Sequence, residues 1–166
     1  MTINVKNALK NPGDSFPLSA ELSFPPEDFQ GEVVFSSVHL DASYCCIGGN
    51  IELKGTVSAR LELICSRCLE SFVQDVECPV EECFSHQPVD DMLAISASDT
   101  IDIDICIRNS ILMSLELLRV CSPHCKGLCP VCGVNRNEVS CTCGAEEAAR
   151  DNPFSVLHEL LNNEEV

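Results

Sequence analysis

Strict alternation of apolar and polar residues over residues 51–63 constrains the fold of this chain more than any other feature. The odd positions carry Ile, Leu, Val, Ala or Gly, and the even positions carry polar or charged residues. Successive side chains of a β-strand point to opposite faces, whereas helical spacing would scatter these apolar residues around every side. The segment therefore predicts a long strand that buries one face.

Segments on both sides of this strand extend it into a sheet. Apolar residues upstream favour one parity, and Gly48 and Gly49 tolerate the positive φ of a tight turn, so residues 33–64 predict a β-hairpin. Alternation returns from Phe72 to Phe84, which predicts a third strand paired antiparallel with the second. The connection between these two strands is a predicted turn at residues 65–68.

The rest of the chain carries weaker patterns. Residues 87–100 are acidic and have no period, which indicates a loop. Brief alternation from Ile101 to Ile107 gives way to helical spacing, which predicts a strand that leads into a helix at about residues 106–119. Asn152 and Pro153 are typical of a helix start, and we expect a short amphipathic helix there that docks on the sheet.

Together these patterns predict an α+β fold. Its body is an antiparallel β-sheet, open or barrel-like, with one or two packing helices and a C-terminal cysteine-rich zinc knuckle. We expect three regions: a β-rich body at residues 1–120, a zinc-knuckle appendage at residues 121–144, and a C-terminal helix with an acidic tail at residues 145–166.

The chain has thirteen cysteines, an odd number. Its first residues do not combine a basic region with an apolar run, and no later stretch reaches the eighteen or so apolar residues of a membrane span. We therefore expect a cytoplasmic protein without membrane contact. In that reducing compartment, cysteines serve as metal ligands or remain thiols, and a disulfide framework is not expected.

Residues 121–144 hold six cysteines and almost no large apolar residue, so they cannot form an ordinary core. The spacing Cys129-x2-Cys132 followed by Gly133 is typical of a zinc knuckle, because the glycine permits a turn that aims backbone amides at the sulfurs. Tetrahedral zinc needs a second pair, for which Cys141 with Cys143 competes with Cys121 and Cys125. The candidate ligands of structural Zn²⁺ are Cys129, Cys132, Cys141, Cys143, Cys121 and Cys125.

Cys65 and Cys68 flank the predicted strand turn. They could join Cys121 and Cys125 in a second tetrad if the two segments meet in space, and a turn with unligated thiols is the alternative. His124 has six thiols nearby and is a weaker ligand candidate. The remaining cysteines lack metal-ligand spacing, so we interpret them as small buried residues or edge thiols; they are Cys45, Cys46, Cys78, Cys83 and Cys106.

The charge of the chain disfavours direct binding to nucleic acid. Ten Lys and Arg residues against 26 Asp and Glu residues give a formal net charge of −16, which repels phosphate backbones and suits a basic protein partner. Residues 70–104 have no Lys or Arg and form either a solubilising surface or a docking face. Their ten acidic residues are Glu70, Asp75, Glu77, Glu81, Glu82, Asp90, Asp91, Asp99, Asp102 and Asp104.

The sequence offers no support for catalysis. It contains no Ser, His and Asp arrangement with a nucleophile motif and no glycine-rich phosphate loop. A zinc ion held by four cysteines also lacks the open position that catalytic zinc needs. We expect a protein that is not an enzyme.

Four segments together resemble the YceD family of large ribosomal RNA subunit accumulation proteins, and they occur in the order found in that family. They are Cys65-Ser-Arg-Cys68-Leu-Glu, the Ile101-Asp-Ile-Asp run, Cys125-Lys-Gly-Leu-Cys129-Pro-Val-Cys132-Gly-Val-Asn, and Asn152-Pro-Phe-Ser-Val-Leu. The resemblance covers the chain from about residue 15, and its third segment is the most specific. It implies a factor needed for normal levels of 23S ribosomal RNA, without established catalytic residues. Some members of the family lack the second cysteine cluster, which implies that the knuckle is mainly structural.

The implied role in RNA accumulation conflicts with the acidic charge of the chain, which disfavours direct contact with RNA. A Zn(Cys)4 centre carries a net charge of about −2, which cancels the positive balance of residues 119–144. We therefore expect binding to a basic ribosomal protein or a large-subunit assembly intermediate through residues 70–104, with ribosomal RNA involved indirectly. The alternatives are a thiol redox or metal-handling protein that uses the cysteine pairs, and a nucleic-acid-binding zinc module.

Overall fold

The computed structural model describes residues 1–25 and 33–143, which form two compact units. Unit 1 comprises residues 1–65 and 70–121, and the described part of unit 2 comprises residues 66–69 and 122–143. The helix expected within residues 145–166 lies outside the described residues. In the part of the chain that is described, no helix has the length and apolar character needed to cross a membrane.

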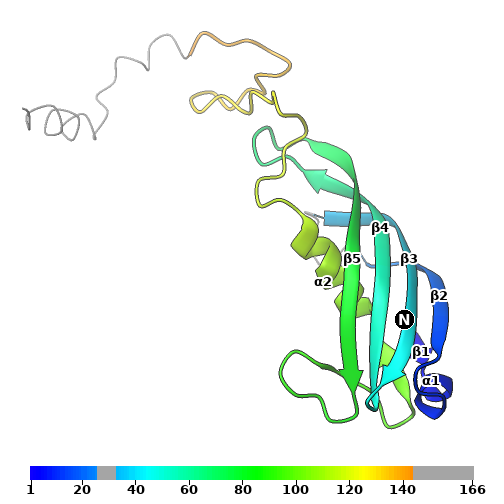
Figure 1. The fold of residues 1–166 in the computed structure, drawn as a ribbon. Coiled ribbons are helices and arrows are strands. Elements are labelled where there is room, and N and C mark those ends of the chain that lie inside the picture. Colours follow the sequence, from blue (N-terminus) through cyan, green and yellow to red (C-terminus); the bar gives the residue numbers. More distant parts are fainter. Residues whose placement is uncertain (26–32, 144–166) are drawn as a thin grey trace, which may run out of the picture. The chain divides into compact units, whose positions relative to one another are not determined.

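Unit 1 is built on a five-stranded sheet (Figure 1). The strand order is β2-β3-β4-β5-β6, and every pair is antiparallel except β5 with β6. Strands β2 and β6 are the edges and do not pair with each other, so the sheet is open and the barrel-like option is wrong. The predicted α+β class with a mainly antiparallel sheet is confirmed. The strands are β2 (Ser15–Leu22), β3 (Val33–Ile47), β4 (Asn50–Ile64), β5 (Ser71–Ser85) and β6 (Leu93–Ala94).

The three long central strands follow the predicted pairing. Strands β3 and β4 form a hairpin whose turn places Gly48 and Gly49 at φ of +60° and +87°, the left-handed region that favours glycine. Strands β4 and β5 pair from Ile51 opposite Phe84 to Ile64 opposite Ser71, and the predicted turn lies between them. The odd residues of β4 from 57 to 63 are all buried, as the alternation predicted.

Gly55 is the exception to the apolar alternation, and the structure gives the reason. A Cβ atom at this position would lie 2.4 Å from both the Ala42 Cβ and the Asp41 carbonyl oxygen on the paired strand. Real Cβ contacts are not this short. Strands β3 and β4 therefore approach each other more closely here than a side chain at position 55 would permit.

Short elements complete unit 1. Strand β1 (Thr2–Asn4) pairs with β7 (Thr100–Asp102), and helix α1 (Lys6–Lys10) follows β1. Helix α2 (Asp104–Ser114) packs on one face of the sheet (Figure 1). Its Ile107 and Ile111 side chains are fully buried there, so this is the inner face. All residues of the hydrophobic core cluster belong to unit 1, so this unit has an apolar core of its own.

Helix α2 ends five residues before the expected position at Arg119. Leu115 has an extended backbone with ψ of 140°, and the Ser114 hydroxyl donates to the Ile111 carbonyl at 2.6 Å. This hydroxyl occupies the carbonyl that the next backbone N–H of the helix would otherwise use, so it competes with continuation of the helix. Leu118, which the helical spacing had included, is 72% exposed as a result.

The described part of unit 2 lacks a comparable apolar core. In residues 66–69 and 122–143 the buried residues are three cysteines and one glycine: Cys68, Cys125, Gly127 and Cys129. An isolated bridge pairs Leu128 with Asn135, and Leu128 N–H donates to the Arg67 carbonyl at 2.9 Å. The Arg67 guanidinium donates to the Cys125 carbonyl at 3.1 Å. A segment whose buried side chains are thiols needs a source of stability other than hydrophobic burial.

Candidate metal centres

Eight of the thirteen cysteines form two groups of four, within each of which the sulfur atoms all lie within 4.8 Å of one another. Zinc–sulfur bonds of about 2.3 Å place the sulfurs of a tetrahedral site about 3.8 Å apart, so both groups are compact enough to surround one ion. We call Cys65, Cys68, Cys121 and Cys125 tetrad A. We call Cys129, Cys132, Cys141 and Cys143 tetrad B.

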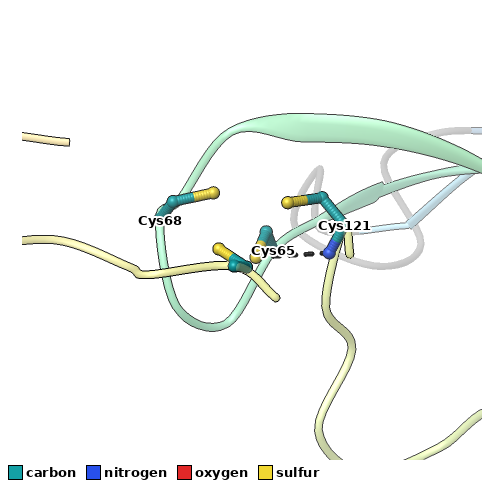
Figure 2. Close-up of side chains that lie close together, drawn as sticks. Cys65, Cys68 and Cys121 are labelled. Atoms are coloured by element: carbon teal, nitrogen blue, oxygen red, sulfur yellow. Dashed lines mark hydrogen bonds between the residues drawn. The ribbon is translucent and has the colours of Figure 1, made fainter. Parts of the chain in front are cut away.

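In tetrad A, two pairs of cysteines from distant parts of the sequence come together. Figure 2 shows Cys65 beside Cys121, with a dashed line for the hydrogen bond between them. Cys65, Cys68 and Cys125 are buried and Cys121 is exposed. The backbone N–H of Cys121 donates to the Cys65 sulfur at 3.4 Å. Local backbone bonds shape each pair, since Cys65 N–H donates to the Glu70 carbonyl and Cys125 N–H to the Ser122 carbonyl.

Tetrad B contains the Cys129 and Cys132 pair for which a knuckle was predicted. Cys129 N–H donates to the Val134 carbonyl at 2.8 Å and Gly133 N–H donates to the Cys129 carbonyl at 2.9 Å, which closes a tight turn. Gly133 has a φ of +72°, the positive value that the sequence predicted for the residue after Cys132. Cys141 and Cys143 complete the group. Of the two pairs considered as partners for Cys129 and Cys132, this one lies beside them.

The thiols of tetrad B perturb one another in a way that favours a bound cation. Backbone N–H groups of Cys132 and Val131 lower the pKa of the Cys129 thiol to about 6. A hydrogen bond with Cys132 raises the pKa of the Cys143 thiol to about 12, and a hydrogen bond with Cys129 raises the pKa of the Cys141 thiol. One sulfur is therefore held readily as a thiolate, while the crowded neighbours share protons that a divalent ion would displace.

The donor chemistry of both tetrads fits zinc. Four cysteine sulfurs suit a borderline-soft divalent ion with tetrahedral geometry, and they leave no coordination position for water or substrate. His124 is exposed and belongs to neither group. If zinc were held by either tetrad, its role would be to fix the surrounding chain.

Three residues near the tetrads were not singled out by the sequence. The Asn137 side-chain N–H donates to the Cys125 sulfur at 3.3 Å, and Arg67 binds the Cys125 carbonyl. Gly127 has a φ of +69°, and a Cβ atom there would lie 2.8 Å from the Arg67 carbonyl oxygen. Only the positive φ of Gly127 has a sequence signal, since a glycine between two close cysteines is typical of a turn.

The sequence interpretation holds only in part for the other five cysteines, because Cys83 is not fully buried and the adjacent Cys45 and Cys46 lie on β3, which is not an edge strand. Cys46, Cys78 and Cys106 are buried in the core, and Cys45 and Cys83 are half-buried. Burial raises the pKa of the Cys106 thiol to about 12, and burial also raises the pKa of the Cys78 thiol. Such thiols are poor nucleophiles and poor ligands, and no disulfide forms among the thirteen cysteines.

The acidic residues of residues 70–104 do not share one face. Glu77 and Glu81 are exposed on the outer face of β5, whereas Glu82 points inward and burial raises the pKa of its carboxyl. Asp75 accepts two hydrogen bonds from the Arg60 guanidinium, at 2.7 and 3.0 Å. The outer face of the sheet therefore carries only part of the acidic charge. It also has a hollow of about 550 Å³ beside Glu77.

Comparison with known proteins places most of the chain in one family. Residues 53–161 match the family described as "Large ribosomal RNA subunit accumulation protein YceD". A chloroplastic protein of Zea mays named "Large ribosomal RNA subunit accumulation protein YCED homolog 1" is 35% identical over a match that covers 57% of this chain and 44% of the maize protein. An uncharacterized protein of Mycobacterium tuberculosis is 26% identical, with 81% of this chain and 70% of that protein covered.

The chain thus spans less than half the length of the maize relative. No solved structure matches the chain.

Proposed function

Because the chain belongs to the YceD family of large ribosomal RNA subunit accumulation proteins, we propose that it is a non-catalytic cytoplasmic factor that supports accumulation of 23S ribosomal RNA during assembly of the large ribosomal subunit. The observation that carries this proposal is the family match, which includes most of β4 and all of β5, α2 and both tetrads. The name of the maize relative supports the same role, although that protein is longer.

The metal in this proposal is a structural zinc ion held by tetrad B. Two observations support it: the buried side chains in residues 66–69 and 122–143 are thiols, and all four donors of tetrad B are cysteines. A closed set of four thiolates gives the ion no catalytic position. Zinc here stabilises a segment that has too few apolar residues to fold by burial.

The partner in this proposal is a basic ribosomal protein or an assembly intermediate that exposes one, and ribosomal RNA is engaged indirectly. The formal net charge of −16 repels bare RNA and attracts basic protein segments. Glu77 and Glu81 contribute to this attraction from exposed positions on β5, and Asp90 and Asp91 do so from the following loop. Exposed charges of this kind mainly accelerate encounter.

One affinity experiment tests both the role and the partner. We expect the tagged full-length chain to recover large-subunit precursor particles from cells, and added salt to reduce the recovery because it screens exposed charges. The variant Glu77→Gln with Glu81→Gln should recover several-fold less at low salt, since electrostatic steering changes association rates by about tenfold or more. Both side chains are exposed, so folding should be unaffected.

A matched control loses the same charge elsewhere. Asp14→Asn with Glu116→Gln removes two exposed carboxylates outside residues 70–104 and should recover particles like the unmodified chain. Equal recovery by the Glu77 and Glu81 variant would eliminate electrostatic capture through β5. If the unmodified chain instead recovered proteins joined to it by mixed disulfides, the thiol redox alternative would replace the proposed role.

A further inference from the structure

We propose that the hollow on the outer face of the sheet is the docking site for a basic protein segment, and that it receives a lysine or arginine side chain of that segment beside Glu77. The partner is the basic protein of the proposed function, on which this docking site rests. The hollow has a volume of about 550 Å³ and is lined by residues of β3, β4 and β5, all of which belong to unit 1.

The strand register explains why the sheet is hollowed at this point. Ser58 on β4 lies opposite His39 on β3 and opposite Glu77 on β5, so the three outward side chains form one row. Neighbouring strands are about 4.8 Å apart, which places the backbones of His39 and Glu77 roughly 10 Å apart with only a small serine between them. The His39 ring also leans away from Ser58, because its Nδ1 lies 2.8 Å from a carboxylate oxygen of Glu21 on β2.

The next row of the register widens the hollow. Ser37, which follows an irregularity in β3, lies opposite Arg60 on β4. The Arg60 guanidinium is drawn toward β5, where it donates to both carboxylate oxygens of Asp75 at 2.7 and 3.0 Å. Space is therefore left above Ser37, and the hollow has small serines in both rows with larger polar side chains around them.

The charges on this face select a cation as the occupant. Within the described strands β2 to β5, each basic side chain on the outer face already has a carboxylate partner: Arg60 with Asp75, Lys54 with Glu52, and His39 with Glu21. An anionic ligand would have to displace one of these partners. A nucleic acid would also bring its phosphates close to the remaining carboxylates, which repel them.

Several carboxylates on the same face remain available for a basic partner. Four that are exposed form no ion pair with the described residues: Asp41, Glu62, Glu77 and Glu81. Of these, Glu77 lines the hollow. A lysine or arginine side chain that enters the hollow can pair with Glu77, and the hydroxyl oxygens of Ser37 and Ser58 can accept hydrogen bonds from its N–H groups.

Filling the hollow tests the docking site without a change of charge. We expect a blocked peptide of three arginines, titrated into the full-length chain and followed by NMR, to shift the amides of Ser37, Ser58 and Glu77 most. Ser58→Phe should weaken binding about threefold to fivefold, the loss expected when one ion pair can no longer form. The control Ser19→Phe adds the same side chain to the outer face of β2, away from the hollow, and should bind like the unmodified chain.

Two results would overturn the docking site: equal binding by Ser58→Phe and the unmodified chain, or largest shifts at Asp90 and Asp91 in the loop after β5. If Ser58→Phe does not fold, the map of shifts in the unmodified chain decides the question. Equal recovery of precursor particles by Ser58→Phe and the unmodified chain would reject the hollow and leave the ribosomal role intact. Recovery of no particles by the unmodified chain, with peptide shifts at the hollow, would reject the ribosomal role and support a site for basic segments.

Discussion

Replacing Cys132 with serine should abolish hydrogen-exchange protection over residues 129–143 and leave the five-stranded sheet protected. The reason is that structural zinc in small modules contributes about 10 kcal/mol or more of binding free energy, whereas this segment has almost no apolar burial to replace it. The informative amides are those of Cys129, Gly133 and Val139, which donate to carbonyls inside the same segment. Exchange measured by mass spectrometry on peptides from each unit would show the contrast.

The sheet is expected to survive because its core cluster lies entirely in unit 1. The control Cys83→Ser also removes one thiol, but from β5 and outside both tetrads, and should leave protection unchanged in both units. Equal loss of protection in the sheet and in residues 129–143 would contradict a separately stabilised, metal-held segment.

Replacing Phe84 with alanine should lower the free energy of unfolding of unit 1 by about 3–5 kcal/mol, the usual cost of removing a buried aromatic ring. Phe84 is fully buried, lies opposite Ile51 on β4 and pairs with Leu93 on β6. The lost ring would leave a cavity at a point where three strands meet. Urea unfolding followed by far-ultraviolet circular dichroism measures the change.

Val73 offers a matched control on the same strand. Its side chain is 62% exposed, so Val73→Ala should change stability by no more than about 0.5 kcal/mol. Similar losses for Phe84→Ala and Val73→Ala would mean that the inner face of β5 is not the core face. Both variants should retain the zinc content of the unmodified chain, because neither residue belongs to a tetrad.

The central sheet could be predicted because two-residue periodicity is a direct property of a half-buried strand. Residues 51–63 and the stretch from Phe72 to Phe84 show that period clearly, and the turns beside them carry either glycines or the Cys65 to Cys68 spacing. The outward position of Glu77 and Glu81 follows from the same parity. Local pattern and tertiary burial agree in these segments, which is why the prediction succeeded there.

Features that depend on long-range geometry could not be predicted in the same way. Whether a sheet closes into a barrel depends on whether its edge strands pair with each other. One edge strand, β6, has only two residues, which is too short to show a periodic pattern in the sequence. The early end of α2 depends on a hydroxyl bond at Ser114. Apolar spacing through Leu118 suggested a longer helix because spacing alone does not report which leucines reach the core.

The sequence predicted metal ligation by the cysteines, but it could not predict which cysteine pairs lie together. The Cys129-x2-Cys132-Gly spacing indicates a knuckle, because local backbone geometry creates it. The grouping of Cys65 with Cys121 depends on how a strand turn and the chain after α2 are brought together, and no spacing encodes that distance. Asn137 was missed for the same reason, since its contact with Cys125 exists only in the folded chain.

The level of 23S ribosomal RNA in cells that lack this chain tests the proposed function most directly. Removal of the gene should lower 23S ribosomal RNA relative to the small-subunit ribosomal RNA, and expression of the full-length chain should restore the ratio. Quantification of both RNAs during growth, with an inactive unrelated protein expressed as the control, measures the effect. An unchanged ratio in cells that lack the chain would contradict a role in accumulation of the large-subunit RNA.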